Sequence, residues 1–255
     1  MTAARNSSGV ESAYPATIIS RPPADRLIDI WPQPVFVPDG APAPAWWLVG
    51  AHGGAGVSSL AASWVFAGDA MGAFPGGFDE ESPFVLVVAR EHAQGIGRAH
   101  DLITQHLSGH GGPTTLVGLI TVAAHPGKLA APLRQRLEVV TGLVGDRHWR
   151  IPWIDEWISL TPDELPSWTP GDPIPTGRKQ PPAAAVVPRA VAATGEAISV
   201  VDRQPAQPRQ LGEPMLTQIL LDTTHTAVLA IEQPNRWLRR WHRRCGESSE
   251  SSCGR

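Results

Sequence analysis

The stretch that decides the fold is WWLVGAHGGAGVSSLAASW, residues 46–64. A short apolar run of strand type leads into a glycine-rich turn and then into a segment of helical composition. The backbone N–H groups of such a turn and of the following first helical turn point at one spot, where the helix dipole favours negative charge. Gly53, Gly54 and Gly56 permit the positive φ angles and close backbone approach that an anion site needs. The sequence therefore predicts a strand, an anion-binding turn and a helix, in that order.

Further strands and helices alternate after this turn. Residues 58–70, SSLAASWVFAGDA, have helical composition throughout. Continuous apolar runs with β-branched residues over 83–90 and 114–124 are typical of strands buried on both faces. Helices are predicted over residues 95–107 and 128–143, and a last short strand within residues 148–157. Four strands alternating with three helices indicate an α/β fold with a small parallel sheet and right-handed crossovers.

Composition divides the chain into four parts. Proline interrupts the short apolar pieces of residues 1–44, which predicts an extended N-terminal arm over part of the core. Residues 45–160 form the predicted α/β domain. Residues 161–210 are dominated by Pro and Ala, the composition of a disordered linker, and residues 211–255 form a short C-terminal element with a basic tail. We expect the Pro/Ala-rich arm, the linker and the tail to be disordered.

The motif H-G-G-A-G-V-S-S, residues 52–59, resembles the variant Walker motif K-G-G-x-G-K-[ST]-[ST] of the ParA/MinD family of P-loop ATPases. It matches the family at the three glycines and at both hydroxyls. It departs at both lysines, because His52 and Val57 stand in their places. The resemblance covers about residues 46–160 and looks nearest to actinobacterial ParA-like proteins with an HGGAGVS loop.

The resemblance implies a sheet of P-loop NTPase type that binds ATP or ADP with Mg²⁺ and forms a homodimer. In such ATPases the motif lysine neutralises phosphate charge, and an aspartate at a strand end holds the metal. Val57 cannot replace that lysine, and no such aspartate is visible between the turn and residue 84, so we expect hydrolysis to be lost before binding. The implied phosphate-binding residues are Gly53, Gly54, Ala55, Gly56, Val57, Ser58 and Ser59.

Three interpretations of the turn stay open. The first is a nucleotide-sensing or structural adaptor with little or no ATP hydrolysis, which family analogy places in DNA partitioning, conjugation or secretion. The second is a scaffold without nucleotide, in which the glycines only make a tight turn. The third is an active ATPase in which another basic residue, such as Arg90 or Lys128, replaces the lysine. His52 is either a pH-dependent anion contact or an ordinary loop histidine.

The segment RWLRRWHRR, residues 236–244, is the second functional candidate. On a helix, Trp237, Leu238 and Trp241 share one face, and arginines occupy the remainder. Such a segment suits an anionic membrane surface or a nucleic-acid backbone, and it is also compatible with a solvated tail. An unknown protein is the remaining expected partner. The candidate contact residues are Arg236, Trp237, Arg239, Arg240, Trp241, Arg243 and Arg244.

Composition and charge exclude other classes. A net charge of −3 and a pI near 6.3 argue against a protein that binds polyanions over its whole surface. The first twenty residues lack a signal-peptide pattern, and no run reaches the length of a membrane span, so we expect a cytoplasmic protein that the tail can bring to a membrane. His242, Cys245 and Cys253 are unevenly spaced, and no metal site is predicted from them.

Overall fold

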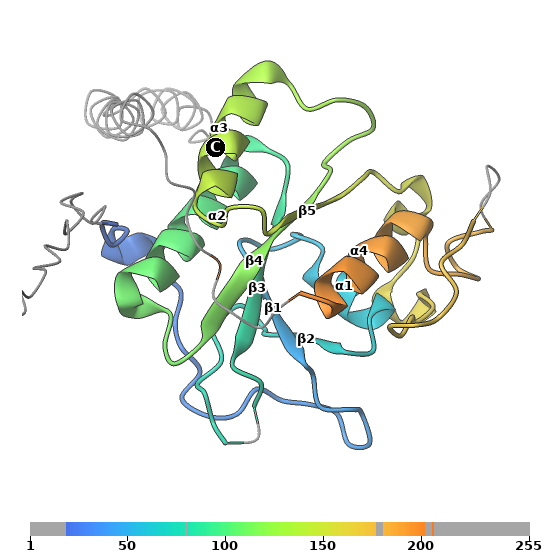
Figure 1. Cartoon of the computed structure of the whole chain (residues 1–255), viewed down its shortest axis with the longest axis horizontal. Helices are drawn as coiled ribbons and strands as arrows, with labels where there is room; N and C mark the ends of the chain where they lie inside the picture. The colour runs from blue at the N-terminus through green and yellow to red at the C-terminus, as the bar shows by residue number, and fades with distance from the viewer. Residues whose placement is uncertain (1–18, 80, 177–180, 202–205, 207–255) are drawn as a thin grey trace, which may run out of the picture. The chain divides into compact units, whose positions relative to one another are not determined.

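The computed structural model describes residues 19–79, 81–176, 181–201 and 206 (Figure 1). Five strands form one sheet in the order β2-β1-β3-β4-β5, and all neighbouring pairs are parallel. The prediction of an α/β fold with a parallel sheet is confirmed. The strands are β1 (Trp46–Gly50), β2 (Ala67–Asp69), β3 (Phe84–Arg90), β4 (Thr115–Val122) and β5 (His148–Ile151).

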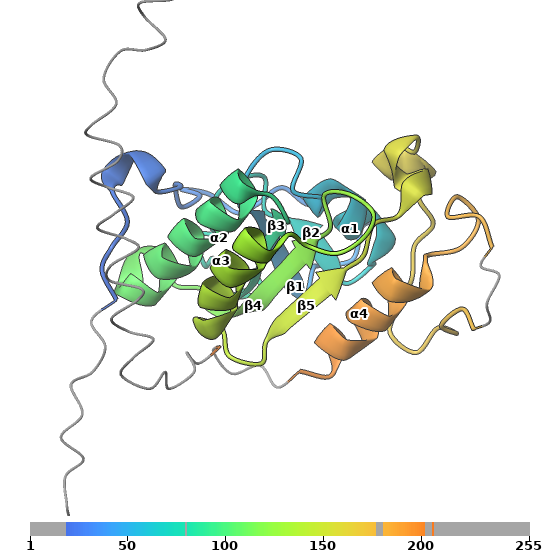
Figure 2. The same ribbon diagram turned by 90° about the horizontal axis from the view of Figure 1, so that it is seen from above.

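Helices cover both faces of this sheet. In Figure 2, α2 and α3 lie together over one face, while α1 and α4 lie on the other side of the strands. The helices are α1 (Val57–Ser63), α2 (Ala93–Gln105), α3 (Ala131–Gly142) and α4 (Arg189–Ser199). Shorter turns are the 3₁₀ segments η1 (Ala24–Arg26), η3 (Asp155–Ile158) and η4 (Pro162–Glu164) and the π-helical turn η2 (His106–His110) that continues α2.

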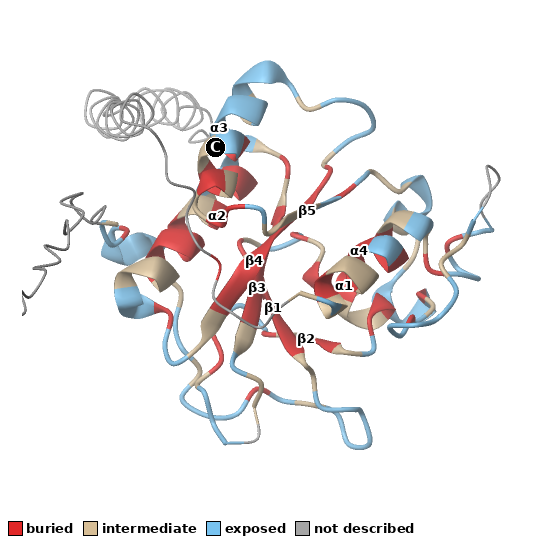
Figure 3. Cartoon of the chain, viewed as in Figure 1, coloured by how far each residue is buried: buried red, intermediate tan, exposed pale blue. Residues whose placement is uncertain are grey.

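The core consists of two layers separated by the sheet, and the inner strands β1, β3 and β4 are almost entirely buried (Figure 3). Trp47 and Val49 of β1 join the layer under α2 and α3, whereas Trp46 and Leu48 join the layer under α1 and α4. Successive side chains of a strand point to opposite faces, so a strand covered on both faces needs apolar residues at every position. This requirement explains the continuous apolar runs in the sequence.

The strand order creates a topological switch point between β1 and β3. From β1 the chain moves outward to β2, and it then returns to the other side of β1 to build β3, β4 and β5 in succession. At such a point, the connections that follow two neighbouring strands run to opposite sides of the sheet and leave a crevice between them at its carboxyl edge. Open α/β sheets bind ligands in this crevice. The turn of residues 51–56 and the start of α2 meet at this edge.

The prediction of one helix over residues 58–70 is wrong in its second half. Helix α1 ends at Ser63, and Trp64 already has extended backbone angles, φ −122° and ψ 107°. Trp64, Val65 and Phe66 are aromatic or β-branched, and such residues favour extended structure. The chain then forms the three-residue strand β2, which pairs with β1. The sheet therefore has five strands instead of the four predicted.

The prediction of disorder is also wrong for the described part of the 161–210 segment. Helix α4 buries Val191, Ala192 and Ile198 against the sheet. The carbonyl oxygen of Val191 accepts a hydrogen bond of 3.2 Å from the indole N–H of Trp64. Alanines gave this segment the composition of a linker, but small side chains also allow a helix to approach a sheet closely. The candidate domain boundary at residue 160 thus lies within one packed layer.

Residues 19–44 of the N-terminal arm are described and pack on the core, so the prediction of disorder is wrong for them. Its half-buried Trp31 packs on the α2 and α3 layer and donates a hydrogen bond of 2.8 Å to the carbonyl oxygen of Ala70. Residue Ile30 forms an isolated parallel bridge with Phe74. Residues 1–18 and 207–255, which include the basic tail, lie outside the described part of the chain.

Two identical substitutions in different helices test the packing of α4. A Cβ atom on Gly195 would lie 2.7 Å from Nε1 of Trp64 and 2.8 Å from the ring of Trp168, whereas a Cβ atom on Gly97 of α2 meets nothing within 4 Å. We expect Gly195→Ala to lower the free energy of unfolding by about 1–3 kcal/mol through overpacking. Gly97→Ala should raise it by up to about 1 kcal/mol, because alanine has the higher helix propensity. Urea unfolding of both variants measures this, and equal effects would contradict the close packing of α4.

Candidate functional site

The glycine turn lies where the sequence predicted it, between β1 and α1. Gly54 has φ 77° and Gly56 has φ 104°, a left-handed conformation that favours glycine. Gly53 does not use a positive φ angle, but it is exposed and nothing would surround a Cβ atom there. Gly56 is the residue directly before the first turn of α1. The backbone geometry required for a tight strand-to-helix turn is therefore present.

Most backbone donors of this turn are open. Ala55 donates its N–H to the carbonyl oxygen of His52 at 3.2 Å, which closes the turn. Within the described residues, the N–H groups of Gly53, Gly54, Gly56 and residues 57–59 donate no hydrogen bond. Helix α1 has only seven residues, so the peptide N–H groups rather than a long helix dipole are its means of attracting an anion.

Side chains of the turn divide into an inner and an outer set. Ala55 and Val57 are buried, and both belong to the core layer of α1 and α4. The side chain of Val57 packs against the end of β1. A Cβ atom added to Gly50 would lie only 3.1 Å from Cγ2 of Val57. Ser58 is exposed and Ser59 is half-buried. At the position where the resembled motif has a lysine, this chain thus has a side chain that packs in the core.

An aspartate stands beside the turn. The hydroxyl of Ser58 donates a hydrogen bond of 3.0 Å to Oδ2 of Asp69, the last residue of β2, and Oδ1 of Asp69 accepts from the backbone N–H of Met71 at 2.8 Å. The expectation that no strand between the turn and residue 84 ends in an aspartate is therefore wrong. The prediction of one helix over residues 58–70 hides Asp69. The aromatic and β-branched run Trp64, Val65, Phe66 before it is the sequence signal for a strand.

Arg90, the last residue of β3, ties the turn to two neighbouring strands. Its guanidinium donates from Nε to the carbonyl oxygen of Gly54 at 3.1 Å and from Nη1 to that of Ala123 at 3.3 Å. Its backbone N–H donates to Nε2 of His52 at 3.2 Å. Lys128, the other basic candidate, is exposed in the connection between β4 and α3. Of the two, Arg90 is the one that contacts the turn.

Both ring nitrogens of His52 interact with backbone groups. Since Nε2 accepts from Arg90, the ring proton lies on Nδ1, which is 2.8 Å from the carbonyl oxygen of Gly53. For His52 to contact an anion, one of its ring nitrogens would have to give up its present backbone partner. This geometry favours a role as a brace between the turn and β3.

The ring of His92 lies against that of His52, with ring centroids 4.8 Å apart and the ring planes tilted by 48°. Its Nδ1 atom accepts the N–H of Gly95 at 3.0 Å and so caps α2. A Cβ atom on Gly95 would overlap the carbonyl oxygen of Arg90, which explains why the first turn of α2 has glycine at this position. The pKa of His92 lies below its ordinary value, first because of desolvation and then because of nearby His52 and Arg90. These causes favour the neutral form of the His92 ring.

Next to Arg90, a buried ion pair joins β3 to the outer strand β5. The carboxylate of Glu91 is only 2% exposed, and Arg150 donates to both of its oxygens at 2.7 Å. The hydroxyl of Thr121 donates to the same carboxylate at 3.1 Å and lies 2.8 Å from Nε2 of His148. A bidentate pair with a further donor satisfies the buried charge. Sequence patterns gave no indication of this network.

Removal of one partner tests this ion pair. We expect Arg150→Met to lower the free energy of unfolding by roughly 2–4 kcal/mol, because the buried carboxylate of Glu91 loses its counter-charge while Arg150 itself is partly exposed. The matched control is Arg134→Met, which breaks the exposed 3.9 Å pair with Glu138 and should cost at most about 0.5 kcal/mol. Denaturant unfolding at neutral pH gives both values. A loss for Arg150→Met no larger than that of the control would refute a structural role.

Among the described residues there is no group of three or more His, Cys, Asp or Glu side chains suited to a metal ion, and no helix with the length and apolar character of a membrane span. Comparisons with protein-family models, with curated proteins and with solved structures found no match. The geometry at the carboxyl edge of β1, β2 and β3 is therefore the basis for a functional proposal.

Proposed function

We propose that this chain is a ParA/MinD-like protein that binds the phosphates of ATP or ADP, with Mg²⁺, at the turn of residues 52–59. It acts as a nucleotide-sensing or structural adaptor with little or no ATP hydrolysis. The observation that carries the proposal is the hydrogen bond between Ser58 and Asp69, directly beside the open N–H groups of the glycine turn. A hydroxyl at the helix start and an aspartate at a strand end are the pair with which P-loop NTPases hold Mg²⁺.

The donor set fits Mg²⁺. This ion prefers oxygen ligands, keeps several waters and commonly uses one or two protein oxygens together with substrate phosphates. Ser58 and Asp69 supply one hydroxyl and one carboxylate within 3.0 Å of each other. When bound, the metal would neutralise phosphate charge; Ser58 and Asp69 would hold it, and the N–H groups of the turn would orient the phosphates.

Binding without turnover follows from Val57. Phosphoryl transfer depends on electrostatic stabilisation of charge on the transferred group, to which the motif lysine contributes. The side chain of Val57 is buried in the core and offers neither charge nor donor to a ligand. Recognition by backbone donors does not require that side chain, so loss of the lysine affects catalysis more than affinity.

One observation favours a second candidate, an ATPase in which Arg90 replaces the lysine. The guanidinium of Arg90 already contacts Gly54 of the turn, and the described contacts use two of its five N–H donors. Its charge therefore lies at the turn without a described carboxylate partner. A scaffold that only inherited the glycine turn is the outcome if no nucleotide binds. A role in partitioning, conjugation or secretion rests on family analogy alone, and so does the formation of a homodimer.

Calorimetric titration with ATP and ADP, with and without Mg²⁺, tests the proposal. We expect the wild type to bind nucleotide. The affinity of Gly53→Glu should be lower by about tenfold or more, because its carboxylate would repel phosphate from an exposed position of the turn. Gly53→Gln, with the same shape and no charge, is the matched control and should bind more tightly than Gly53→Glu. Absence of binding by the wild type at millimolar nucleotide would sink the adaptor proposal in favour of the scaffold.

The metal pair has its own test. Asp69→Asn retains the oxygen that accepts the N–H of Met71 and removes the negative charge. We expect this variant to bind ATP without Mg²⁺ as the wild type does, and to lose the gain in affinity that Mg²⁺ gives the wild type. ATP turnover that disappears in Arg90→Ala and persists in Lys128→Ala would instead establish the second candidate.

Titration of His92 by NMR gives an independent reading of the same site. In the free protein we expect the ring to titrate below the ordinary histidine pKa, about 6.5, so that it is neutral at pH 7. A phosphate group bound at the turn would stabilise the imidazolium form, so ADP should raise the pKa of His92. An unchanged titration at saturating ADP would place the nucleotide elsewhere on the protein.

A further inference from the structure

The carboxylate of Asp69 is oriented by the turn that follows it. One of its oxygens, Oδ2, accepts the hydroxyl of Ser58 at 3.0 Å, while the other, Oδ1, accepts the backbone N–H of Met71 at 2.8 Å. Rotation of the carboxylate about its Cβ–Cγ bond would break both hydrogen bonds. The direction in which Asp69 faces Ser58 therefore depends on where the backbone N–H of Met71 lies.

This turn, residues 70–73, has a strained residue at its second position. Met71 has φ 55° and Gly72 has φ 83°. The N–H of Ala73 donates to the carbonyl oxygen of Ala70 at 3.4 Å, which closes the turn. Two consecutive positive φ angles are typical of a type I′ turn, whose first central position favours asparagine, aspartate or glycine. Methionine is exposed there, so burial of its side chain does not offset the strain.

The N-terminal arm holds this turn from outside. The indole N–H of Trp31 donates to the carbonyl oxygen of Ala70 at 2.8 Å. The backbone N–H of Trp31 donates to the carbonyl oxygen of Phe74 at 2.9 Å, and the N–H of Phe74 donates to that of Asp29 at 2.9 Å. Trp31 thus contacts the residue that begins the turn through its side chain and the residue that follows the turn through its backbone.

The arm is itself fixed to α2. The side chain of Gln105, only 2% exposed, accepts the backbone N–H of Ile28 at 3.0 Å and donates to the carbonyl oxygen of the same residue at 2.8 Å. Arg98 of the same helix donates to the carbonyl oxygen of Arg26 at 2.7 Å. Because α2 belongs to the packed core layer, these hydrogen bonds give Trp31 a fixed position beside the end of β2.

We propose that Trp31 is a positioning residue for Asp69. Its indole holds the carbonyl oxygen of Ala70 and so keeps Met71 in the left-handed conformation. The N–H of Met71 then directs the carboxylate of Asp69 toward Ser58. This inference rests on the proposed function, in which Ser58 and Asp69 hold Mg²⁺, and it gives the N-terminal arm a part in metal binding.

Calorimetric titration of Trp31→Phe with ATP, with and without Mg²⁺, tests this role. Phenylalanine keeps an aromatic ring against the core and removes the indole N–H. We expect ATP alone to bind as it does to the wild type. The gain in affinity from Mg²⁺ should fall by about three- to tenfold, the range of one net hydrogen bond.

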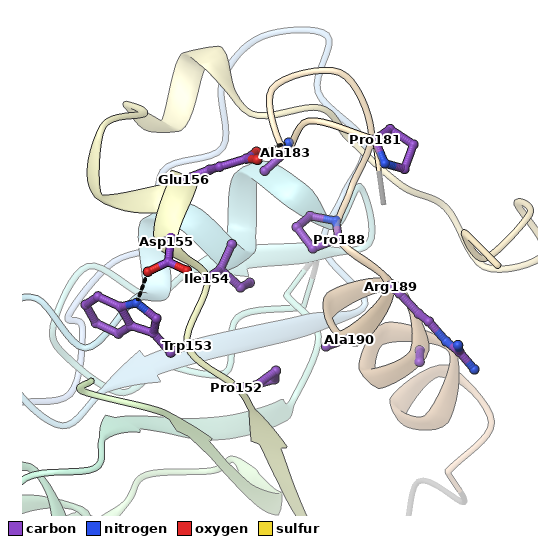
Figure 4. A pocket seen from close by; sticks show the side chains of 11 residues that line it. Pro152, Trp153, Ile154, Asp155, Glu156, Pro181, Ala183, Pro188, Arg189 and Ala190 are labelled. Carbon is purple, nitrogen blue, oxygen red and sulfur yellow. Dashed lines mark hydrogen bonds between the residues drawn. The ribbon is translucent and has the colours of Figure 1, made fainter. Parts of the chain in front are cut away.

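Trp153→Phe is the matched control. The indole N–H of Trp153 also makes one hydrogen bond, to Oδ1 of Asp155 at 2.7 Å, but it does so in the segment after β5 (Figure 4). This variant should keep the full gain from Mg²⁺. An equal loss in both variants, or a full gain in Trp31→Phe, would overturn the proposal.

A second substitution separates positioning from a general loss of stability. In Met71→Asn, asparagine favours the left-handed conformation and precedes Gly72, and Asn-Gly is a preferred pair in type I′ turns. The double variant Trp31→Phe, Met71→Asn should therefore recover most of the gain from Mg²⁺ that Trp31→Phe loses. If the double variant loses as much as Trp31→Phe, the tryptophan does not act through the turn and the proposal fails.

An NMR measurement without nucleotide distinguishes this inference from the proposed function. The amide proton of Met71 donates to a carboxylate, a strong acceptor that moves its resonance downfield. The resonance should move upfield in Trp31→Phe and stay in place in Trp153→Phe. An unchanged resonance in Trp31→Phe would overturn the positioning role alone. A wild type that binds no nucleotide would overturn the proposed function, and the part of Trp31 in metal binding with it.

Discussion

The carboxyl edge of the sheet depends on how strand β3 ends. Three consecutive residues there form hydrogen bonds with three different parts of the fold. Arg90 donates to the turn after β1, Glu91 accepts from Arg150 of β5, and His92 accepts from the first turn of α2. Because β3 lies between β1 and β4, these contacts connect four of the five strands at the point where chain connections separate. The glycine turn is therefore held from a neighbouring strand as well as by its own backbone.

This arrangement explains how the turn can keep its shape without the lysine of the family it resembles. The path of the turn is set by Gly54, Gly56 and the carbonyl oxygen that Arg90 binds, none of which depends on the side chain at position 57. An apolar residue there adds to the core instead. Under the proposed function, Val57 adds to the core while the backbone donors of the turn remain in place.

The second half of the chain completes the fold. Helix α4 covers the sheet beside α1, and the proline-rich approach to α4 returns to the segment after β5. Segments with the composition of a linker thus complete a core layer. The residues proposed to hold nucleotide and metal all precede residue 91, so this layer supports the sheet without contributing a side chain to the proposed site.

The sequence by itself determined the parallel α/β class, the glycine turn and three of the four described helices, although it extended the first of these too far. It did so because long apolar runs and helical spacing are local signals. Only the tertiary structure decided the rest. Strand β2 has three residues, too few for a periodic pattern, so Asp69 became recognisable only through its pairing with β1. The buried face of α4 includes Gly195, which carries no apolar signal in the sequence and whose close packing depends on Trp64 and Trp168. Arg90 and Glu91 acquire roles only from residues distant in sequence, which no local pattern encodes.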